Sequence, residues 1–471
     1  METGPSTREK ALALNLDGTM HGTFAEIGAG QEVARWFFSV GRAAGTVAKT
    51  ISAYDMAVSD ALYGHAQRYV SRQRLEAMLD HEFGQLTASL GPARGSSTRF
   101  FAFANTVATR SRTHDAPGRG WVGLRFQRRP LEEPSQVIVH VHLRDVTTIG
   151  QQEALGMLGV NLVHGAFVHH EAAFVLVETL MDGLSRARIE IDMIKLSGPA
   201  FAGVDNRLMA LQLVEHGLTD AAMFTAAGEV VQPSEVLYKR PILVERGTFR
   251  PVTLVSLDVL ESARDLFVAE PAVRGTDPVI VAEMTLRTLT SGDHVDQVDH
   301  TDFLDRAYIL CGLGFDVLIS RFQPYYQLAE YLAAYTDRMI GIAVGVPTVR
   351  EIVEERFYTE LGGGVLESIG RLFKRSVKMY VYPTRDPASG RVIAVEHANL
   401  PPPWPHLQSL LFELHLIEPI RAYNEAYLSI RTTDVLARIQ RGDSSWEAMV
   451  PPPVAAIIKT QKLFGLQGGR P

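Results

Sequence analysis

Two charged residues interrupt apolar runs of the sequence where strands are expected. Lys195 lies within the run 189–196, and Glu283 lies within the run 279–286. A charge in such a run requires a partner or a shifted pKa, because burial disfavours the ionised form. Lys195 is therefore a candidate base or Schiff-base nucleophile, and Glu283 is its candidate acid–base partner. A buried Lys–Glu pair without catalytic function would give the same pattern.

Three arginines, Arg246, Arg250 and Arg321, stand at or just after the ends of apolar runs. In a parallel sheet these ends form the carboxyl edge, which is the usual ligand side in barrels and in open sheets. The planar guanidinium group binds carboxylate and phosphate oxygens with two parallel hydrogen bonds. The sequence therefore predicts three substrate-binding arginines and an anionic small-molecule ligand.

A turn with two glycines, Gly28 and Gly30, follows an expected strand over residues 22–27 and precedes an expected helix over residues 31–40. Such glycines let backbone N–H groups approach a phosphate or a cofactor at a helix N-terminus. The third glycine of the G-x-G-x-x-G pattern is missing. Gly28 and Gly30 are candidate cofactor-binding residues for an unknown cofactor, and a tight structural turn is the alternative.

The next segment, residues 41–49, combines glycines with a hydroxyl group and two cations. Thr46 is a candidate hydrogen-bond donor and Lys49 a candidate point charge for an anionic substrate. The segment lacks the G-x-x-x-x-G-K-[ST] pattern of a phosphate-binding loop. Close packing of its small residues is the alternative.

Neither the histidines nor the cysteine indicate a metal site. The pairs His140/His142 and His169/His170 have no acidic residue nearby in the sequence at ligand spacing, so we predict no metal ligands. The single cysteine, Cys311, excludes an intrachain disulfide.

The elements that must position these residues alternate between strand and helix after residue 155. This alternation predicts an α/β domain, either a closed (β/α)8 barrel of the TIM type or an open doubly wound sheet. We expect an N-terminal α+β domain over residues 1–150, the barrel-like domain over 151–390 and a helical C-terminal cap over 391–471. The eight expected strands are Val160–Phe167, Ile189–Leu196, Ala221–Thr225, Ile242–Thr248, Val279–Leu286, Phe315–Ser320, Ile340–Val346 and Lys378–Tyr382.

Composition sets the broad class. The chain has 471 residues, of which 46% are hydrophobic and 21% charged, and its net charge is −7. These values are typical of a folded globular protein and do not point to nucleic acid as a partner. The sequence lacks an apolar run of about 18 residues, so we expect no membrane partner. We expect a soluble cytoplasmic protein, and the sequence leaves open whether it forms a homo-oligomer.

Seven segments, spread over nearly the whole chain, carry a resemblance to known proteins; they are residues 22–35, 45–49, 52–56, 103–109, 204–209, 246–253 and 339–346. Together they resemble a bacterial family of proteins of about this length. Members of this family sometimes carry labels such as nicotinic acid mononucleotide adenylyltransferase or TonB-dependent receptor.

The two labels imply different chemistry. An adenylyltransferase of this kind uses a His-x-Gly-His element for triphosphate, and that element is absent. A TonB-dependent receptor needs an export signal and a large outer-membrane barrel, and we expect neither. The favoured hypothesis is an enzyme, a lyase or a transferase, that acts on a phosphorylated or nucleotide-like molecule. Nucleotidyl transfer and a non-catalytic metabolite-binding or assembly function are the alternatives.

Overall fold

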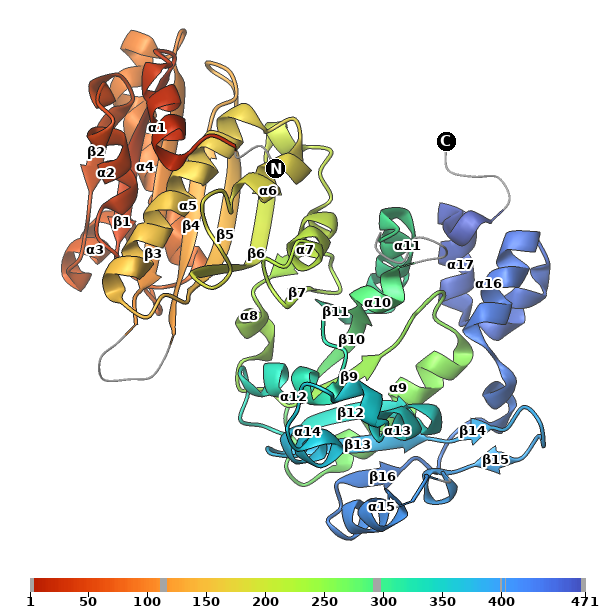
Figure 1. The fold of residues 1–471 in the computed structure, drawn as a ribbon. Helices are drawn as coiled ribbons and strands as arrows, with labels where there is room; N and C mark the ends of the chain where they lie inside the picture. Colours follow the sequence, from red (N-terminus) through yellow and green to blue (C-terminus); the bar gives the residue numbers. More distant parts are fainter. Residues whose placement is uncertain (1–3, 111–116, 291–297, 399, 403, 467–471) are drawn as a thin grey trace. The chain divides into compact units, whose positions relative to one another are not determined.

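The structure, a computed structural model, describes residues 4–110, 117–290, 298–398, 400–402 and 404–466. It consists of two compact units, residues 1–220 and residues 221–471 (Figure 1). Both units combine helices with a sheet that contains parallel strands, so the predicted α/β class is confirmed. None of the described helices is both long and apolar enough to span a lipid bilayer.

The first unit is built on a six-stranded sheet in the order β2-β1-β3-β4-β5-β6. β1 is parallel to both β2 and β3, and the remaining neighbours are antiparallel. Alternate residues face opposite sides of a strand, and each side of this sheet is apolar and buried. The strands are β1 (Met20–Ile27), β2 (Val47–Ile51), β3 (Arg99–Ala108), β4 (Gly118–Phe126), β5 (Ser135–Leu143) and β6 (Ile189–Ser197).

Helices cover both faces of this sheet. The larger apolar cluster joins one face to five helices: α1 (Thr7–Leu16), α2 (Glu32–Ser39), α5 (Thr148–Val168), α6 (Ala173–Thr179) and α7 (Asn206–Glu215). The 23-residue helix α4 (Arg72–Arg94) packs on the other face through Phe83 and Leu86, and α3 (Met56–Tyr63) lies beside it.

Residues 151–220 differ from the sequence-based expectation. The run 160–167 is part of helix α5 and not a strand, because a short apolar run fits a buried helix as well as a buried strand. The run 189–196 lies in β6, which pairs antiparallel with β5 and completes the first sheet. The chain therefore divides after residue 220, whereas the sequence predicted a boundary near residue 150.

The second unit has an eight-stranded sheet in the order β16-β13-β12-β9-β10-β11-β7-β8. The six strands from β16 to β11 are parallel, and β7 and β8 join antiparallel. The strands are β7 (Ala221–Phe224), β8 (Val230–Val231), β9 (Ile242–Arg246), β10 (Val279–Thr285), β11 (Asp316–Ser320), β12 (Ile340–Gly345), β13 (Val377–Tyr382) and β16 (Ile417–Pro419), and a separate pair is formed by β14 (Thr384–Arg385) and β15 (Val392–Ile393).

This sheet is open, with β16 and β8 as its edges. If β9 is counted first, the parallel strands follow the order 3-2-1-4-5-6 of a doubly wound sheet. The doubly wound alternative of the sequence analysis therefore describes the second unit. The chain reverses direction across the sheet between β9 and β12, which makes this the topological switch point.

Two apolar clusters lie on opposite faces of the second sheet. One joins the sheet to α8 (Pro233–Leu237), α12 (Tyr325–Ala333), α13 (Val346–Ile352), α14 (Gly364–Leu372) and α15 (Trp404–Glu413). The other joins it to α9 (Leu254–Ala269). Further helices are α10 (Leu286–Leu289), α11 (His300–Gly312), α16 (Thr432–Arg441) and α17 (Pro452–Gln461). Ile417, which lies within the expected helical cap, instead begins the strand β16.

Gly28 occupies the tight turn that follows β1. Its φ angle is +101°, in the left-handed region, and a Cβ atom built at this position would lie 1.7 Å from the Val107 carbonyl oxygen. Only glycine permits both this conformation and this close approach of the end of β3.

We expect Gly28→Ala to lower the free energy of unfolding by more than the roughly 1–3 kcal/mol of a strained backbone conformation alone. Gly41→Ala is the matched control, because Gly41 has a φ of +82° but open space around the position of its Cβ. Urea unfolding of both variants separates backbone strain from the steric overlap. Equal losses of stability would mean that the contact with Val107 has no effect.

Candidate functional site

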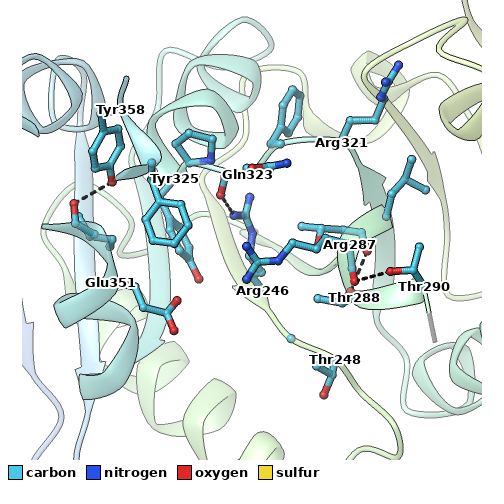
Figure 2. A pocket seen from close by; sticks show the side chains of 17 residues that line it. Arg246, Thr248, Arg287, Thr288, Thr290, Arg321, Gln323, Tyr325, Glu351 and Tyr358 are labelled. Atoms are coloured by element: carbon cyan, nitrogen blue, oxygen red, sulfur yellow. Dashed lines mark hydrogen bonds between the residues drawn. The ribbon is translucent and has the colours of Figure 1, made fainter. Parts of the chain in front are cut away.

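A pocket of about 610 Å³ lies at the carboxyl edge of the second sheet (Figure 2). The segments that follow β9, β10 and β11 line it, together with the C-terminal end of α13 and the residues after it. Ligands of open α/β sheets bind outside the carboxyl ends of the strands, at the switch point. β9 borders the switch point, and its last residue, Arg246, lines the pocket.

Arg246 is held by a buried ion pair. Its Nε donates to Glu283 Oε2 at 2.8 Å, and its Nη2 donates to Glu283 Oε1 at 3.0 Å. Ser320 Oγ donates to the same carboxylate at 2.6 Å, so Glu283 joins residues from three adjacent strands. Burial alone would lower the pKa of Arg246, but the Glu283 carboxylate offsets this and holds that pKa above its ordinary value. Arg246 therefore remains charged, and Glu283 compensates its charge.

The same guanidinium also fixes the segment that follows β11. Arg246 Nη1 donates to the Gln323 carbonyl oxygen at 2.7 Å, and the guanidinium carbon lies 4.4 Å from the centre of the Tyr325 ring. Burial raises the pKa of Tyr325 to about 12, so its phenol stays protonated. Arg246 is only 11% exposed, and its contacts hold the segment after β11 that lines the pocket.

Two other arginines give the pocket its uncompensated positive charge. Arg287 is the second residue after β10 and lies in α10, Arg321 follows β11 directly, and both side chains are exposed. Neither has an ion-pair or hydrogen-bond partner for its side chain among the described residues. Three arginines and one glutamate, the exposed Glu351, are the charged residues among the described ones that line the pocket.

The pocket differs in character between its two sides. Figure 2 shows Arg246 between one side with Tyr325, Tyr358 and Glu351 and another side with Arg321 and Thr290. The Thr288 hydroxyl group donates to the Thr285 carbonyl oxygen, and the Thr290 hydroxyl group donates to the Arg287 carbonyl oxygen. These two hydrogen bonds stabilise the turn that carries Arg287. One side thus offers cations, and the other offers aromatic rings and a carboxylate.

The structure places the other predicted residues of the second unit as follows. Arg250 does not line the pocket, and its Nε donates to Asp302 Oδ1 at 2.5 Å. Asp302 is also paired with Arg306. Glu283 is fully buried behind Arg246, so its carboxylate serves the ion pair. Arg246 and Arg321 are the two predicted arginines that the structure brings to one pocket.

Sequence reasoning missed Arg287 and Glu351. Arg287 directly follows the expected strand 279–286, so the rule that found the other arginines applies to it equally. Glu351 lies in α13, and nothing in its local sequence distinguishes it from a solvated glutamate on a helix.

The predicted residues of the first unit are engaged in contacts within that unit. Lys195 lies on β6 opposite Ile138 of β5, whereas Glu283 belongs to the second unit. Thr46 is buried, and its hydroxyl donates to the Leu14 carbonyl oxygen at 3.4 Å. Lys49 Nζ lies 2.5 Å from the buried carboxylate of Glu82. These contacts favour structural roles for Thr46 and Lys49.

The turn with Gly28 and Gly30 leads into α2, and N–H groups of the first turn of this helix are already bonded to the side chain of Glu26. Glu26 Oε2 accepts from Val33 N at 3.1 Å, and Glu26 Oε1 accepts from Ala34 N at 2.9 Å. Asn105 Nδ2 donates to the same carboxylate at 3.1 Å. The backbone donors that a cofactor would use are bound to Glu26, which supports the alternative of a structural turn.

Comparisons with known proteins find low similarity. No family model and no curated protein sequence match the chain. The competence/damage inducible protein CihA of Agrobacterium tumefaciens is 18% identical, with 35% of this chain and 97% of that chain covered and a TM-score of 0.25. The Plasmodium falciparum nicotinic acid mononucleotide adenylyltransferase is 11% identical, with coverages of 48% and 98% and a TM-score of 0.29. Similarities at these TM-scores assign no function to the pocket.

The Arg246–Glu283 pair predicts a specific pattern of stability. Glu283→Ala leaves a buried guanidinium without its counter-charge, which costs roughly 3–5 kcal/mol. The double variant Arg246→Met/Glu283→Leu removes both charges and should recover most of that loss. Thermal and urea unfolding measure the stability of both variants. A double variant that is no more stable than Glu283→Ala would show that the loss arises from packing and not from the unpaired charge.

Glu26 predicts a pH dependence. Burial raises the pKa of Glu26 from 4.5 to about 7, although the hydrogen bonds from Ala34, Val33 and Asn105 lower it. The folded protein therefore keeps a proton that the unfolded chain loses, and stability should fall as the pH rises from about 4.5 to about 7. Glu26→Gln should reduce this slope, and Glu153→Gln, at an exposed position of the same unit, should leave it unchanged. Equal slopes in Glu26→Gln and the parent would contradict the assignment.

Proposed function

We propose that the second unit binds an anionic small molecule, phosphorylated or nucleotide-like, in the pocket at the carboxyl edge of its sheet. The supporting observation is the pair of exposed arginines, Arg287 and Arg321, that follow adjacent strands and have no partner for their side chains among the described residues. Structural arginines such as Arg246 and Arg250 are paired with carboxylates, so the two unpaired ones are available to a ligand.

The shape of the pocket supports a ligand larger than a single phosphate. Its volume of about 610 Å³ lies within the range of small-molecule sites. Phosphate or carboxylate oxygens would bind at Arg287 and Arg321, each of which offers a fork of donors. The remainder of the ligand would then lie beside Tyr325, Tyr358 and Glu351, where a ring can pack on the aromatic side chains and a hydroxyl group can donate to the carboxylate.

In this proposal Arg246 and Glu283 are positioning residues. Their ion pair holds the segments after β9 and β11, and Glu283 has no access to a ligand because it is fully buried. Lys195 lies in the other unit and is not included. Glu351 is the exposed carboxylate of the pocket and the residue that we would test first for an acid–base function.

Nucleotidyl transfer is a narrower alternative that the sequence resemblance implies. Its histidine element has no counterpart among the described residues that line the pocket, since none of them is a histidine. We therefore propose binding of the anionic ligand as the primary function. Whether a reaction follows is decided by measuring turnover of any ligand that the binding test identifies, with Glu351→Gln as the variant.

The test is a thermal-shift screen with inorganic pyrophosphate, nucleotides and phosphorylated metabolites. We expect at least one anion to stabilise the parent protein, and Arg287→Lys and Arg321→Lys each to weaken its binding. A lost charge-assisted hydrogen bond costs roughly 1.5–3 kcal/mol, which is about tenfold or more in affinity. Arg264→Lys is the matched control, because Arg264 is exposed on α9 and does not line the pocket.

Arg250→Lys separates the sequence-based prediction from the one based on the structure. If Arg250 only pairs with Asp302, this variant loses stability but binds the anion as the parent does. The proposal fails if no anion stabilises the parent protein, or if Arg287→Lys and Arg321→Lys respond to the anion as Arg264→Lys does.

A further inference from the structure

Three potential metal ligands converge on one face of the first sheet. His140 and His142 are two residues apart on β5, so both side chains project to the same side of that strand. Asp192 lies on the neighbouring strand β6. His140 Nδ1 lies 2.6 Å from Asp192 Oδ1, and His142 Nε2 lies 2.9 Å from Asp192 Oδ2.

The three groups are preorganised by their surroundings. Asp192 and His140 are buried, and the His140 ring packs against Trp121 of β4 with 4.8 Å between the ring centres. His142 is 22% exposed, which gives the cluster one accessible side. The pairing of β5 with β6 bulges at this point, because His140 pairs with Met193 and Val141 pairs with Ile191, which leaves Asp192 as the extra residue between them.

We infer that His140, His142 and Asp192 bind one divalent transition-metal ion of the zinc class. The donor set is two imidazole nitrogens and one carboxylate oxygen, which is the set of many zinc and non-haem iron sites that keep a position open. One ligand atom from each of the three residues lies within 4.8 Å of the others, so small side-chain rotations bring them to the roughly 2.0–2.2 Å that such an ion requires. The inference concerns the first unit and does not rest on the function proposed for the second.

The charged groups beside the cluster are of both signs, because His142 pairs with Glu190 of β6 on one side and with Arg119 of β4 on the other. Asp192 is a carboxylate between two imidazoles, and Arg144, the residue that follows β5, is itself paired. Arg144 Nε donates to Glu190 Oε2 at 3.0 Å, so its positive charge is compensated locally. A divalent ion would therefore meet one carboxylate and two imidazoles, with the charge of Arg144 compensated and the exposed Arg119 on the neighbouring strand β4.

The sequence alone could not assemble this site. The sequence shows the two histidines as a pair. Their acidic partner, Asp192, lies 50 or more residues further along the chain, and the pairing of β5 with β6 brings it next to them.

The experiment uses the full chain, freed of metal with a chelator, and titrates it with Co²⁺ and then Zn²⁺. We expect one equivalent of Co²⁺ to give visible ligand-field absorption, one equivalent of Zn²⁺ to abolish it, and His142→Ala to bind at least tenfold more weakly. His65→Ala is the matched control, because His65 Nδ1 lies 3.2 Å from Asp60 Oδ2 in a single exposed His–Asp pair. This control should bind both ions as the parent does.

Each outcome decides the inference. Asp192 is buried, so the variants are made at the more exposed His142, and circular dichroism verifies that His142→Ala is folded. If His142→Ala does not fold, the Co²⁺ spectrum and stoichiometry of the parent protein decide. Absence of stoichiometric binding to the parent, or equal binding by folded His142→Ala and His65→Ala, would overturn the inference.

Discussion

The buried ion pair between Arg246 and Glu283 is the interaction on which the carboxyl edge of the second sheet depends. Removing two charges from water is costly, and this cost is offset only where geometry is good and the remaining polar atoms are bonded. Both conditions hold here, since the pair is bidentate and Ser320 and the Gln323 carbonyl oxygen complete its hydrogen bonds. The pair therefore ties three neighbouring strands and one loop into a single arrangement.

Arg287 and Arg321 differ from Arg246 in their surroundings. All three lie at or just after the carboxyl ends of parallel strands and line one pocket, but a buried carboxylate compensates only Arg246. The remaining charge lies on two exposed side chains that no described carboxylate binds. In the function that we propose, an anion would supply the missing partner.

In the first unit, the groups that could bind an anion are already bound by acidic side chains of the chain itself. The carboxylate of Glu26 occupies the N-terminal donors of α2, and Glu82 binds Lys49 and accepts from the Tyr63 hydroxyl at 2.8 Å. Motifs that suggest anion binding in the sequence are thus satisfied by the chain's own acids. A cationic or glycine-rich segment indicates a ligand site only when its donors lack an internal partner.

The sequence predicted the features that depend on local pattern and not those that depend on pairing. Strand–helix alternation gave β9 to β13 and the carboxyl-edge positions of Arg246 and Arg321. The helical nature of residues 160–167 was missed because the same apolar residues suit either element. The counter-charge of Arg250, the contact of Gly28 with Val107 and the approach of Asp192 to the histidines join residues 50 or more positions apart, and no local pattern contains them.

The most direct test of the central claim is a crystal structure of the protein with bound pyrophosphate. The account predicts phosphate oxygens within hydrogen-bond distance of the Arg287 and Arg321 guanidinium groups, with Arg246 still paired to Glu283. Pyrophosphate bound elsewhere, or an Arg246 that leaves Glu283 to bind it, would contradict the account.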